Sequence, residues 1–209
     1  FTSSPDIVLQ PNSVESVQKI MRFCFENRIR VTPQGGNTGL CGATVTTEGV
    51  LLNLSKLNRI RDINLADNSM TVEAGVILQN AQKAADKAGR LFPLSLASEG
   101  SCQIGGNIAC NAGGLNVLRY GSMRDLVLGL EVVLPNGELV SHLQPLHKNT
   151  TGYDLRHLFI GSEGTLGIIT AATLKLFAQP KTKATAWVGL DDIESAVSLL
   201  IAVQGHFAE

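Results

Sequence analysis

Glycine is the residue type whose spacing in this sequence carries the clearest chemistry. Fourteen of the 21 glycines fall in three windows, residues 35–42, 100–121 and 152–167. Glycine allows positive φ angles and lets the backbone approach a ligand closely. We therefore predict that backbone from three places converges on one ligand. The alternative is that the windows are mobile loops, but such loops are usually also rich in Lys, Glu and Ser, and these are not.

The charges around these windows indicate the kind of contact that the ligand would make. Neither residues 31–55 nor residues 91–118 contain Lys, Arg or His. A phosphate bound there must be held by peptide N–H groups, as it is at helix N-termini and in backbone nests. The common nucleotide motifs are absent: no two glycines are separated by a single residue, which excludes GxGxxG, and no GxxxxGK[ST] occurs.

The cysteines and histidines show no metal-binding or catalytic pattern. Cys24 lies on the apolar face of a predicted helix, and Cys41, Cys102 and Cys110 lie among glycines. We expect all four to be small buried residues. Without a CxxC pair or a recognisable signal peptide, they are expected to be reduced intracellular thiols. The four histidines form no cluster, so we predict neither a metal site nor a catalytic base in this chain.

Composition limits the class of protein further. The chain has 17 Lys and Arg against 18 Asp and Glu, a net charge of −1. A protein that coats nucleic acid would normally be strongly basic. Apolar residues make up 44% of the chain and charged residues 17%, which is a globular composition. The longest stretch without charges, residues 100–118, is interrupted by Ser, Gln, Asn and Gly, so no membrane span is predicted.

Hydrophobic periodicity and turn residues predict an α/β unit in the first 90 residues, with the order β-α-β-β-β-β-α. Its expected elements are a strand at 7–9, a helix capped by Asn12 with an apolar face from Val14 to Phe25, strands at 29–31 and 50–54, a hairpin of 60–65 and 69–73, and a helix at 76–88 closed by Gly89.

The remaining residues predict a second α/β or α+β portion. Its expected elements are a strand at 126–134, a hairpin through 135–137 into 138–140, a helical turn at 154–159, a strand at 168–177, a strand at 184–190 and a helix at 191–203 capped by Asp191. One strand and one helix cannot bury their apolar faces alone, so we expect residues 181–209 to begin an incomplete substrate or cap domain. The alternative is a C-terminal helix packed on the main body.

Four ordered motifs resemble one known family. They are residues 33–39 (PQGGNTG), 100–114 (GSCQIGGNIACNAGG), 152–155 (GYDL) and 159–169 (FIGSEGTLGII). Together they are similar to the FAD-binding domain of the vanillyl-alcohol-oxidase, or PCMH, type. Within it they resemble the D-2-hydroxyacid dehydrogenase branch, which includes D-2-hydroxyglutarate dehydrogenase, the FAD subunit of glycolate oxidase and FAD-linked D-lactate dehydrogenase. The resemblance implies an α+β fold with a PCMH-type FAD-binding domain at 1–180, in subdomains of about 1–95 and 96–180.

The resemblance also implies which residues contact FAD. The first loop would wrap the pyrophosphate with Pro33, Gln34, Gly35, Gly36, Asn37, Thr38, Gly39, Leu40 and Ala43. The second segment would lie along the pyrophosphate, ribityl chain and ring with Pro93, Leu94, Gly100, Ser101, Cys102, Gly105, Gly106, Asn107, Ala109, Asn111, Gly114, Tyr120 and Gly121. The adenine end would contact Glu163, Gly167, Ile168 and Ile169.

One departure from the family pattern concerns the attachment of the cofactor. Several relatives join the flavin covalently through a His after the paired glycines of the first loop, and this sequence has Asn37 at that place. We therefore predict non-covalent FAD. Some relatives use a Cys near the second motif, and Cys102 lies close to that place, but the local pattern does not match theirs. The base and a metal-binding His cluster belong to the downstream substrate domain in this branch, so we expect no catalytic or metal-binding residue here.

The function implied by the resemblance is oxidation of a D-2-hydroxyacid to a 2-oxoacid, with hydride transfer to flavin N5. The fragment alone would be inactive. The alternative is a non-catalytic FAD-binding subunit of a multi-subunit dehydrogenase. Expected partners are a small 2-hydroxyacid and an electron acceptor such as a quinone, an electron-transfer flavoprotein or a partner subunit; a homodimer is also considered. The expected location is cytoplasmic, with peripheral association at the inner membrane considered, and mitochondrial in a eukaryote.

Overall fold

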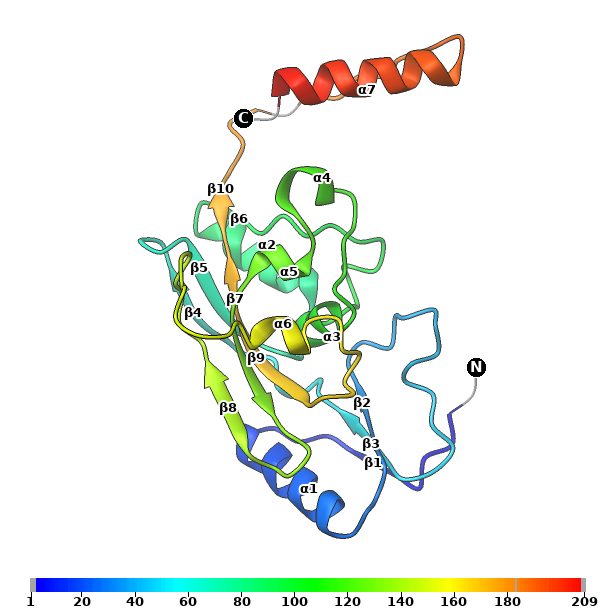
Figure 1. Cartoon of the computed structure of the whole chain (residues 1–209), viewed down its shortest axis with the longest axis vertical. Coiled ribbons are helices and arrows are strands. Elements are labelled where there is room, and N and C mark those ends of the chain that lie inside the picture. The colour runs from blue at the N-terminus through cyan, green and yellow to red at the C-terminus, as the bar shows by residue number, and fades with distance from the viewer. Residues whose placement is uncertain (1–2, 183, 208–209) are drawn as a thin grey trace. The chain divides into compact units, whose positions relative to one another are not determined.

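The computed structural model of the protein describes residues 3–182 and 184–207. Contacts divide the chain into two units, Phe1–Gln179 and Pro180–Glu209. The first seven elements follow the predicted order (Figure 1). They are β1 (Ile7–Leu9), α1 (Val14–Glu26), β2 (Val31–Gln34), β3 (Val50–Asn53), β4 (Ile60–Asn64), β5 (Ser69–Glu73) and α2 (Leu78–Lys87).

The second half of the first unit contains more short elements than the sequence pattern predicts. They are β6 (Arg90–Leu91), α3 (Ile104–Ala109), α4 (Val117–Tyr120), α5 (Met123–Leu126), β7 (Val127–Val133), β8 (Leu139–His142), α6 (Arg156–Phe159), β9 (Ile168–Lys175) and β10 (Phe177–Ala178). The mixture of helices with parallel and antiparallel sheets confirms the α+β class. Among the described residues, none of the helices has both the length and the apolar character of a membrane span.

The strands form three sheets. A parallel sheet has the order β1-β3-β2, an antiparallel sheet of five strands has the order β4-β5-β9-β7-β8, and β10 pairs with β6. The expected subdomain boundary near residue 95 does not separate two sheets, because β5 pairs with β9 along five residues. The central strand β9 therefore joins the early hairpin of β4 and β5 to the later hairpin of β7 and β8.

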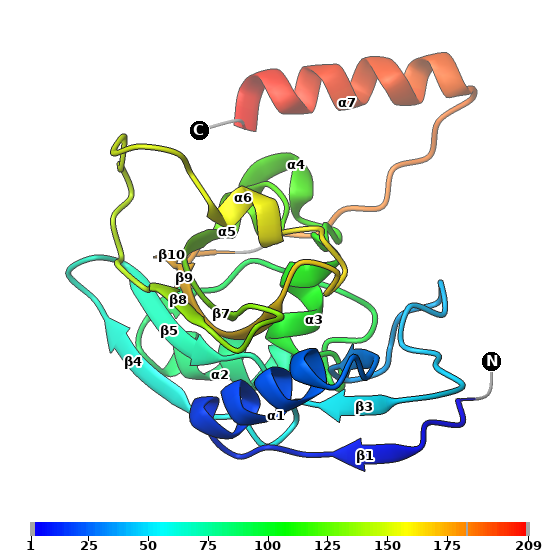
Figure 2. The same ribbon diagram turned by 60° about the horizontal axis from the view of Figure 1, so that its bottom comes forward.

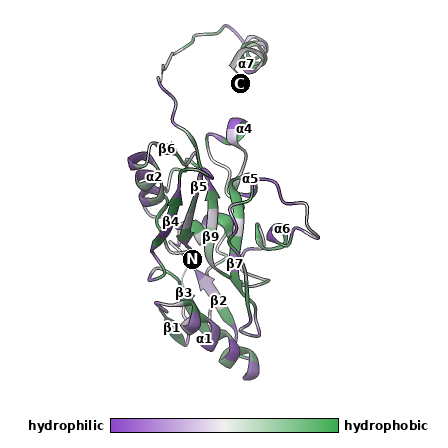
Figure 3. Ribbon diagram, turned by 90° about the vertical axis from the view of Figure 1, so that its left-hand side faces the viewer, coloured by the Kyte–Doolittle hydropathy of each residue, from purple (hydrophilic) through white to green (hydrophobic). Residues whose placement is uncertain are grey.

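Helix α1 contacts β7, an inner strand of the five-stranded sheet. Figure 2 shows α1 along its length, close to β1 and β3 of the parallel sheet. Its N-cap is Ser13 rather than the expected Asn12, because the Ser13 hydroxyl accepts a hydrogen bond from the Ser16 N–H at 3.2 Å. Phe25, expected on the apolar face, is 59% exposed. The residues that α1 buries are Val17, Met21 and Cys24. In Figure 3, α1 carries both hydrophobic and hydrophilic colours, whereas β7 is mostly hydrophobic.

Two buried carboxylates in the five-stranded sheet are held by arginines. Glu73 is 1% and Glu131 is 7% exposed. The Arg61 guanidinium donates to Glu131 at 3.0 and 3.2 Å and to Glu73 at 3.3 Å. Glu73 also accepts from the side chain and the backbone N–H of Arg59, and Glu131 accepts from Thr170 at 2.9 Å. We call Arg59, Arg61, Glu73, Glu131 and Thr170 the carboxylate network.

The second unit contains helix α7 (Ile193–Phe207). The strand expected at residues 184–190 is not formed, since these described residues have no regular secondary structure. The carboxylate of Asp192, not the expected Asp191, accepts the Ser195 N–H at 2.7 Å at the start of the helix. The side chain of Trp187 is fully exposed.

Candidate functional site

The three glycine windows meet in one cleft of the first unit. Its open volume is about 620 Å³. The lining residues come from β2 and the loop after it, from α3, and from the segment before β9. They are Pro33, Gln34, Gly35, Ala43, Thr44, Leu54, Ala74, Gly105, Gly106, Ala109, Cys110, Glu163, Gly164, Gly167, Ile168 and Ile169. The convergence predicted from the glycine spacing is thus present in the structure.

Glycines bring these segments into contact because a side chain would not fit between them. A Cβ atom at Gly36 would lie 2.2 Å from the Ser101 carbonyl oxygen, and one at Gly105 would lie 2.6 Å from the Ala74 Cβ. Gly164 packs so closely on Pro33 that a Cβ would lie 2.4 Å from its ring. Real Cβ atoms do not come this close, so each glycine sets the separation of two chain segments that form the cleft.

Gly106 differs from its neighbour Gly105. A Cβ at Gly106 would meet no protein atom within 4 Å, although the residue lines the cleft. Protein packing therefore does not explain the absence of a side chain at Gly106. A ligand that lies against the backbone of α3 would explain it, because only glycine lets a ligand approach that closely.

The backbone around the cleft carries N–H groups without protein partners. In the described part of the chain, no peptide N–H from Gly35 to Thr44 donates a hydrogen bond to another protein group, and neither does that of Gly106. The Gly35 and Gly106 backbones are adjacent, since a Cβ on Gly35 would lie 3.7 Å from the Gly106 nitrogen. Successive unpaired N–H groups are the donor set that binds diphosphates without basic side chains.

Charged side chains are nearly absent from the cleft. Among its lining residues, Glu163 is the charged one, and no Lys, Arg or His is among them. Glu163 has a φ of +53°, and its N–H donates to the Ala109 carbonyl at 2.9 Å. Partial desolvation by the protein around it, followed by the charges of Glu163 and Cys41, raises the pKa of the Cys110 thiol. The cleft therefore offers peptide dipoles and apolar surface rather than cations.

Fifteen residues that the resemblance implied do not line the cleft. They are Gly36, Asn37, Thr38, Gly39, Leu40, Pro93, Leu94, Gly100, Ser101, Cys102, Asn107, Asn111, Gly114, Tyr120 and Gly121. The side chains of Leu94, Cys102 and Asn107 are buried in the protein, and the Asn107 amide donates to the Cys102 sulfur at 3.5 Å. These three are positioned to support the second segment rather than to face the cleft.

Several of the other implied residues have structural partners. The Tyr120 ring packs edge-on against Phe177 with centroids 4.8 Å apart. Asn111 accepts the Arg124 N–H at 2.9 Å. Gly114 and Gly121 have positive φ angles, and a Cβ at Gly114 would lie 2.1 Å from the Ser95 carbonyl oxygen. They shape the course of the chain after α3.

Five lining residues were missing from the sequence analysis: Thr44, Leu54, Ala74, Cys110 and Gly164. Gly164 belongs to the third glycine window, so its spacing was a usable signal. Leu54 follows β3 and Ala74 follows β5, and neither residue belongs to a sequence motif that would have indicated a place at the cleft. The expectation that Cys110 and Cys41 are buried was wrong, because both are exposed. They lie on a loop and at a helix end rather than in a packed layer.

Of two polar side chains at the first loop, Asn37 has a hydrogen-bond partner for its side-chain oxygen and Gln103 does not. Asn37 has a φ of +53°, and its side-chain oxygen accepts the Thr44 hydroxyl at 2.7 Å, which joins the two ends of the loop. Gln103 is 7% exposed, and its side-chain oxygen has no hydrogen-bond partner among the described residues. A Cβ on Gly35 would lie 3.4 Å from that oxygen, so an unsatisfied acceptor lies directly behind the first loop.

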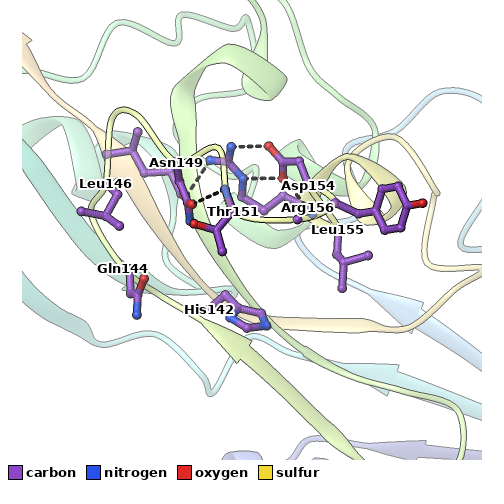
Figure 4. A pocket seen from close by; sticks show the side chains of 11 residues that line it. His142, Gln144, Leu146, Asn149, Thr151, Asp154, Leu155 and Arg156 are labelled. Carbon is purple, nitrogen blue, oxygen red and sulfur yellow. Dashed lines mark hydrogen bonds and ion pairs between the residues drawn. The ribbon is translucent and has the colours of Figure 1, made fainter.

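A second pocket lies beside β7 and β8 and shares no lining residue with the cleft (Figure 4). It is lined by polar side chains that include His142, Asn149 and Arg156. The Arg156 guanidinium is fully engaged, because it pairs with Asp154 and donates to the backbone oxygens of residues 127 and 128 at 2.8 and 2.6 Å. Arg156 therefore anchors the loop before α6 and offers no free cation to a ligand.

The fold places the chain in a class of proteins. An alkyldihydroxyacetonephosphate synthase is superposable on 87% of this chain and 33% of its own, with a TM-score of 0.76 at 24% identity. The 6-hydroxy-D-nicotine oxidase of Arthrobacter nicotinovorans covers 87% of this chain and 38% of its own, with a TM-score of 0.75 at 22% identity. At identities this low, the similarity shows a shared fold and nothing about activity. The fold is the PCMH-type FAD-binding fold that the motifs led us to expect.

The particular family follows from the sequence itself. The FAD binding domain model matches residues 5–142, and the chain belongs to that family. FAD is therefore the cofactor of this domain. The cleft fits it: unpaired N–H groups, an open surface at Gly106 and the absence of basic side chains suit a diphosphate held by the backbone.

Among the curated relatives are dehydrogenases and a transhydrogenase. A D-2-hydroxyglutarate–pyruvate transhydrogenase of Saccharomyces cerevisiae is 40% identical over 210 residues, which is 100% of this chain and 42% of the relative. A mitochondrial D-2-hydroxyglutarate dehydrogenase of Danio rerio is 42% identical over 99% of this chain and 39% of its own. A putative mitochondrial D-lactate dehydrogenase of Schizosaccharomyces pombe is 38% identical over 100% and 40%. The chain spans about two fifths of the length of these relatives.

Proposed function

We propose that the chain is the cofactor-binding portion of an FAD-dependent dehydrogenase that oxidises a D-2-hydroxyacid to the 2-oxoacid. The observation that carries the proposal is the convergence of three glycine segments on one cleft without basic side chains. The names of the relatives, which include D-2-hydroxyglutarate and D-lactate dehydrogenases, support the substrate class. D-2-hydroxyglutarate is our first choice of substrate because it occurs in most of those names.

FAD would supply the hydride acceptor, and the chain's own residues would bind and orient it. The N–H groups of the first loop and of Gly106 would hold the diphosphate. Ile168 and Ile169 offer apolar surface to the adenine end, and Glu163 offers a carboxylate acceptor to its amino group. Some residues implied by the resemblance do not line the cleft. They would contact FAD through their backbone or would support the residues that contact it.

We propose that the cofactor is held without a covalent bond. The side chain at the attachment place of some relatives is Asn37, whose amide oxygen already accepts the Thr44 hydroxyl. Cys102, the other candidate for attachment, is 2% exposed, so its sulfur does not reach the cleft. An amide lacks the nucleophilic ring nitrogen of histidine.

The base that removes the hydroxyl proton would come from outside the first unit. Among the described residues, no group of three or more His, Cys, Asp or Glu side chains could hold a metal ion. His157, which lies within the third glycine window, interacts with the Arg124 guanidinium at 2.9 Å. The second unit, residues 180–209, would begin the domain that supplies these groups. The electron acceptor would be a quinone, an electron-transfer flavoprotein or a partner subunit.

The test is an absorption spectrum of the purified chain before and after acid precipitation. We expect flavin bands that pass into the supernatant, because non-covalent FAD is released when the fold is lost. Colour that stays in the pellet would contradict the non-covalent assignment. A colourless chain that also fails to bind added FAD would contradict a working cofactor cleft in this chain. Turnover of D-2-hydroxyglutarate is then measured on a chain as long as the relatives.

A further inference from the structure

The side-chain amide of Gln34, a residue of the cleft wall, has a protein partner for its oxygen but not for its nitrogen in the described part of the chain. Gln34 is the last residue of β2. Its side-chain oxygen accepts a hydrogen bond from the Asn53 amide nitrogen at 3.0 Å. An amide nitrogen carries two N–H donors. Gln34 therefore brings two unused donors to a cleft wall without Lys, Arg or His.

The hydrogen bonds of Asn53 determine which end of the Gln34 amide is free. The backbone N–H of Ser55 donates to the Asn53 side-chain oxygen at 3.1 Å. A backbone N–H can only donate, so the Asn53 atom that faces Ser55 must be the oxygen. The other end of Asn53 is then the nitrogen, which donates to the Gln34 oxygen at 3.0 Å and to the Gly35 carbonyl at 3.5 Å. The atom of Gln34 that remains free is therefore the nitrogen.

Backbone contacts hold the two amides beside one another. Gln34 and Asn53 are directly opposed partners of the parallel strands β2 and β3. The N–H of Leu54 donates to the Gln34 carbonyl at 3.0 Å, and Pro33 packs closely against Gly164. The backbone of Gln34 is thus fixed on both sides, and its hydrogen bond to Asn53 restricts the side chain as well.

The other polar side chains of the cleft wall cannot replace this donor. They belong to Thr44, Cys110 and Glu163. The Thr44 hydroxyl already donates to Asn37 at 2.7 Å, an ionised Glu163 can only accept, and a thiol is a weak donor. Gln34 is therefore the lining side chain that can offer strong donors to a ligand without giving up a protein contact.

We propose that the Gln34 amide nitrogen donates to the diphosphate of FAD beside the peptide N–H groups, and that Asn53 is the positioning residue that orients it. This inference rests on the assignment of the cleft to FAD. Diphosphate oxygens only accept hydrogen bonds, so a donor stabilises them and a carbonyl oxygen in its place would repel them. Asn53 excludes the repelling orientation, because a rotated Gln34 amide would set its N–H groups against those of Asn53.

The first experiment compares the FAD affinity of the parent chain, Gln34→Glu and Gln34→Met by flavin fluorescence. Gln34→Glu keeps an oxygen for Asn53 and replaces the donor by a second oxygen, so we expect affinity to fall at least about thirtyfold near neutral pH. Gln34→Met removes the donor without adding charge, and we expect a fall of about tenfold. An affinity equal to that of the parent in either variant would overturn the proposal.

Two further readouts separate a ligand contact from damage to the fold. A protonated carboxyl donates a hydrogen bond, so the affinity of Gln34→Glu should recover toward the parent value between about pH 8 and about pH 5, whereas that of Gln34→Met should not. Gln34→Glu should also keep the urea midpoint of the parent chain without cofactor, since its contact with Asn53 remains. A lowered midpoint together with a loss that is the same at every pH would show a structural role and overturn the proposal.

Asn53→Asp tests the orientation of the donor. The new carboxylate still accepts from Ser55, but the Gln34 nitrogen must now donate to it, which turns the Gln34 oxygen toward the diphosphate. We expect FAD affinity to fall at least about tenfold with an unchanged urea midpoint. The matched variant is Asn53→Ala, which leaves the Gln34 amide both orientations and should lose only about twofold.

The added charge of Asn53→Asp is controlled by salt. Salt screens a charge at a distance but does not reverse the orientation of an amide, so the loss should persist at about 1 M salt. A loss that disappears there would overturn the orienting role of Asn53. A parent chain that binds no FAD would overturn the proposed function and this inference with it, whereas a parent chain and Gln34→Glu that bind FAD equally would overturn this inference alone.

Discussion

The carboxylate network and the cofactor cleft both stabilise negative charge, and they do so in opposite ways. In the network, the carboxylates of Glu73 and Glu131 belong to the chain and are matched by the guanidinium groups of Arg59 and Arg61. In the cleft, the anion would be a ligand, and the donors are peptide N–H groups without a protein partner in the described residues. A permanent charge is paired by side chains, whereas an exchangeable one is received by the backbone.

The physical reason for the difference is the condition of the donor groups when no ligand is bound. An arginine that faces an unfilled cleft would keep its charge unpaired, or would bind a different anion. Peptide N–H groups at an exposed loop are hydrated when no ligand is present, so their unfilled state costs little. Two kinds of substitution should therefore separate the regions: those in the network change stability, and those in the cleft change cofactor affinity.

The largest expected effect follows from removing the shared cation of the network. Arg61→Met leaves Glu131 buried with Thr170 as its remaining side-chain donor, and we expect a loss of about 3 kcal/mol in the free energy of unfolding. The control is Arg59→Met: its side chain is 74% exposed. Buried Glu73 keeps the N–H of residue 59 and the Arg61 guanidinium in this variant, so the loss should be smaller, about 1–2 kcal/mol. Urea denaturation at neutral pH measures both. Equal losses for the two variants would contradict the central role of Arg61.

The next effect compares two adjacent glycines of α3. Gly105→Ala places a Cβ 2.6 Å from the Ala74 Cβ, so it should destabilise the cofactor-free chain by about 1–3 kcal/mol. Gly106→Ala meets no protein atom within 4 Å and should leave that stability unchanged or slightly higher. Its methyl group would instead enter the cleft, and we expect FAD affinity to fall at least about tenfold.

Denaturation and flavin fluorescence titration, run on both variants, distinguish the two effects. An unchanged FAD affinity in Gly106→Ala would mean that the cofactor does not lie against α3. That result would contradict the binding of the cofactor by the backbone of the cleft, since Gly106 carries one of the unpaired N–H groups.

The smallest effect is the pH dependence of the network. Burial raises the pKa of Glu73, but hydrogen bonds and charge from Arg59 and the charge of Arg61 outweigh it, and the net pKa is lowered. A carboxylate with a lowered folded pKa stabilises the protein above its unfolded pKa of about 4.3, and this contribution is lost as the pH falls through the folded value.

We therefore expect the free energy of unfolding to decline below about pH 4. The decline should be less steep in Glu73→Gln, and the difference in slope should correspond to the uptake of at most about one proton on unfolding. Denaturation curves between neutral and acidic pH compare the variant with the parent chain. Parallel slopes would show that Glu73 has the same pKa in the folded and unfolded chain.

Much of the cleft was predictable because its key residues are glycines in compact motifs. The windows at 35–42, 100–121 and 152–167 specified three segments whose backbones must come close to something, and the structure brings them together. The early elements were also predictable, since alternation and helical spacing are local. The hairpin of β4 and β5 and the helix closed by Gly89 follow from such patterns.

The parts that were not predictable depend on tertiary packing. Helix α3 contains two adjacent glycines, which have a low intrinsic helix propensity, and its first N–H groups bond to residues after β5. Leu54 and Ala74 reach the cleft only because β3 and β5 end beside it. The choice of Ser13 over Asn12 as N-cap lies beyond local signals, because both side chains cap helices well.

The exposed indole of Trp187 makes the second unit optically distinct. It is the single tryptophan of the sequence, and its side chain is fully exposed. Emission excited in the red edge of the protein band therefore comes from one position between Pro180 and Glu209. A shift of that emission to shorter wavelength would show that something has covered this segment, whether a further stretch of chain or another molecule, and no labelling or mutation is needed to assign the signal.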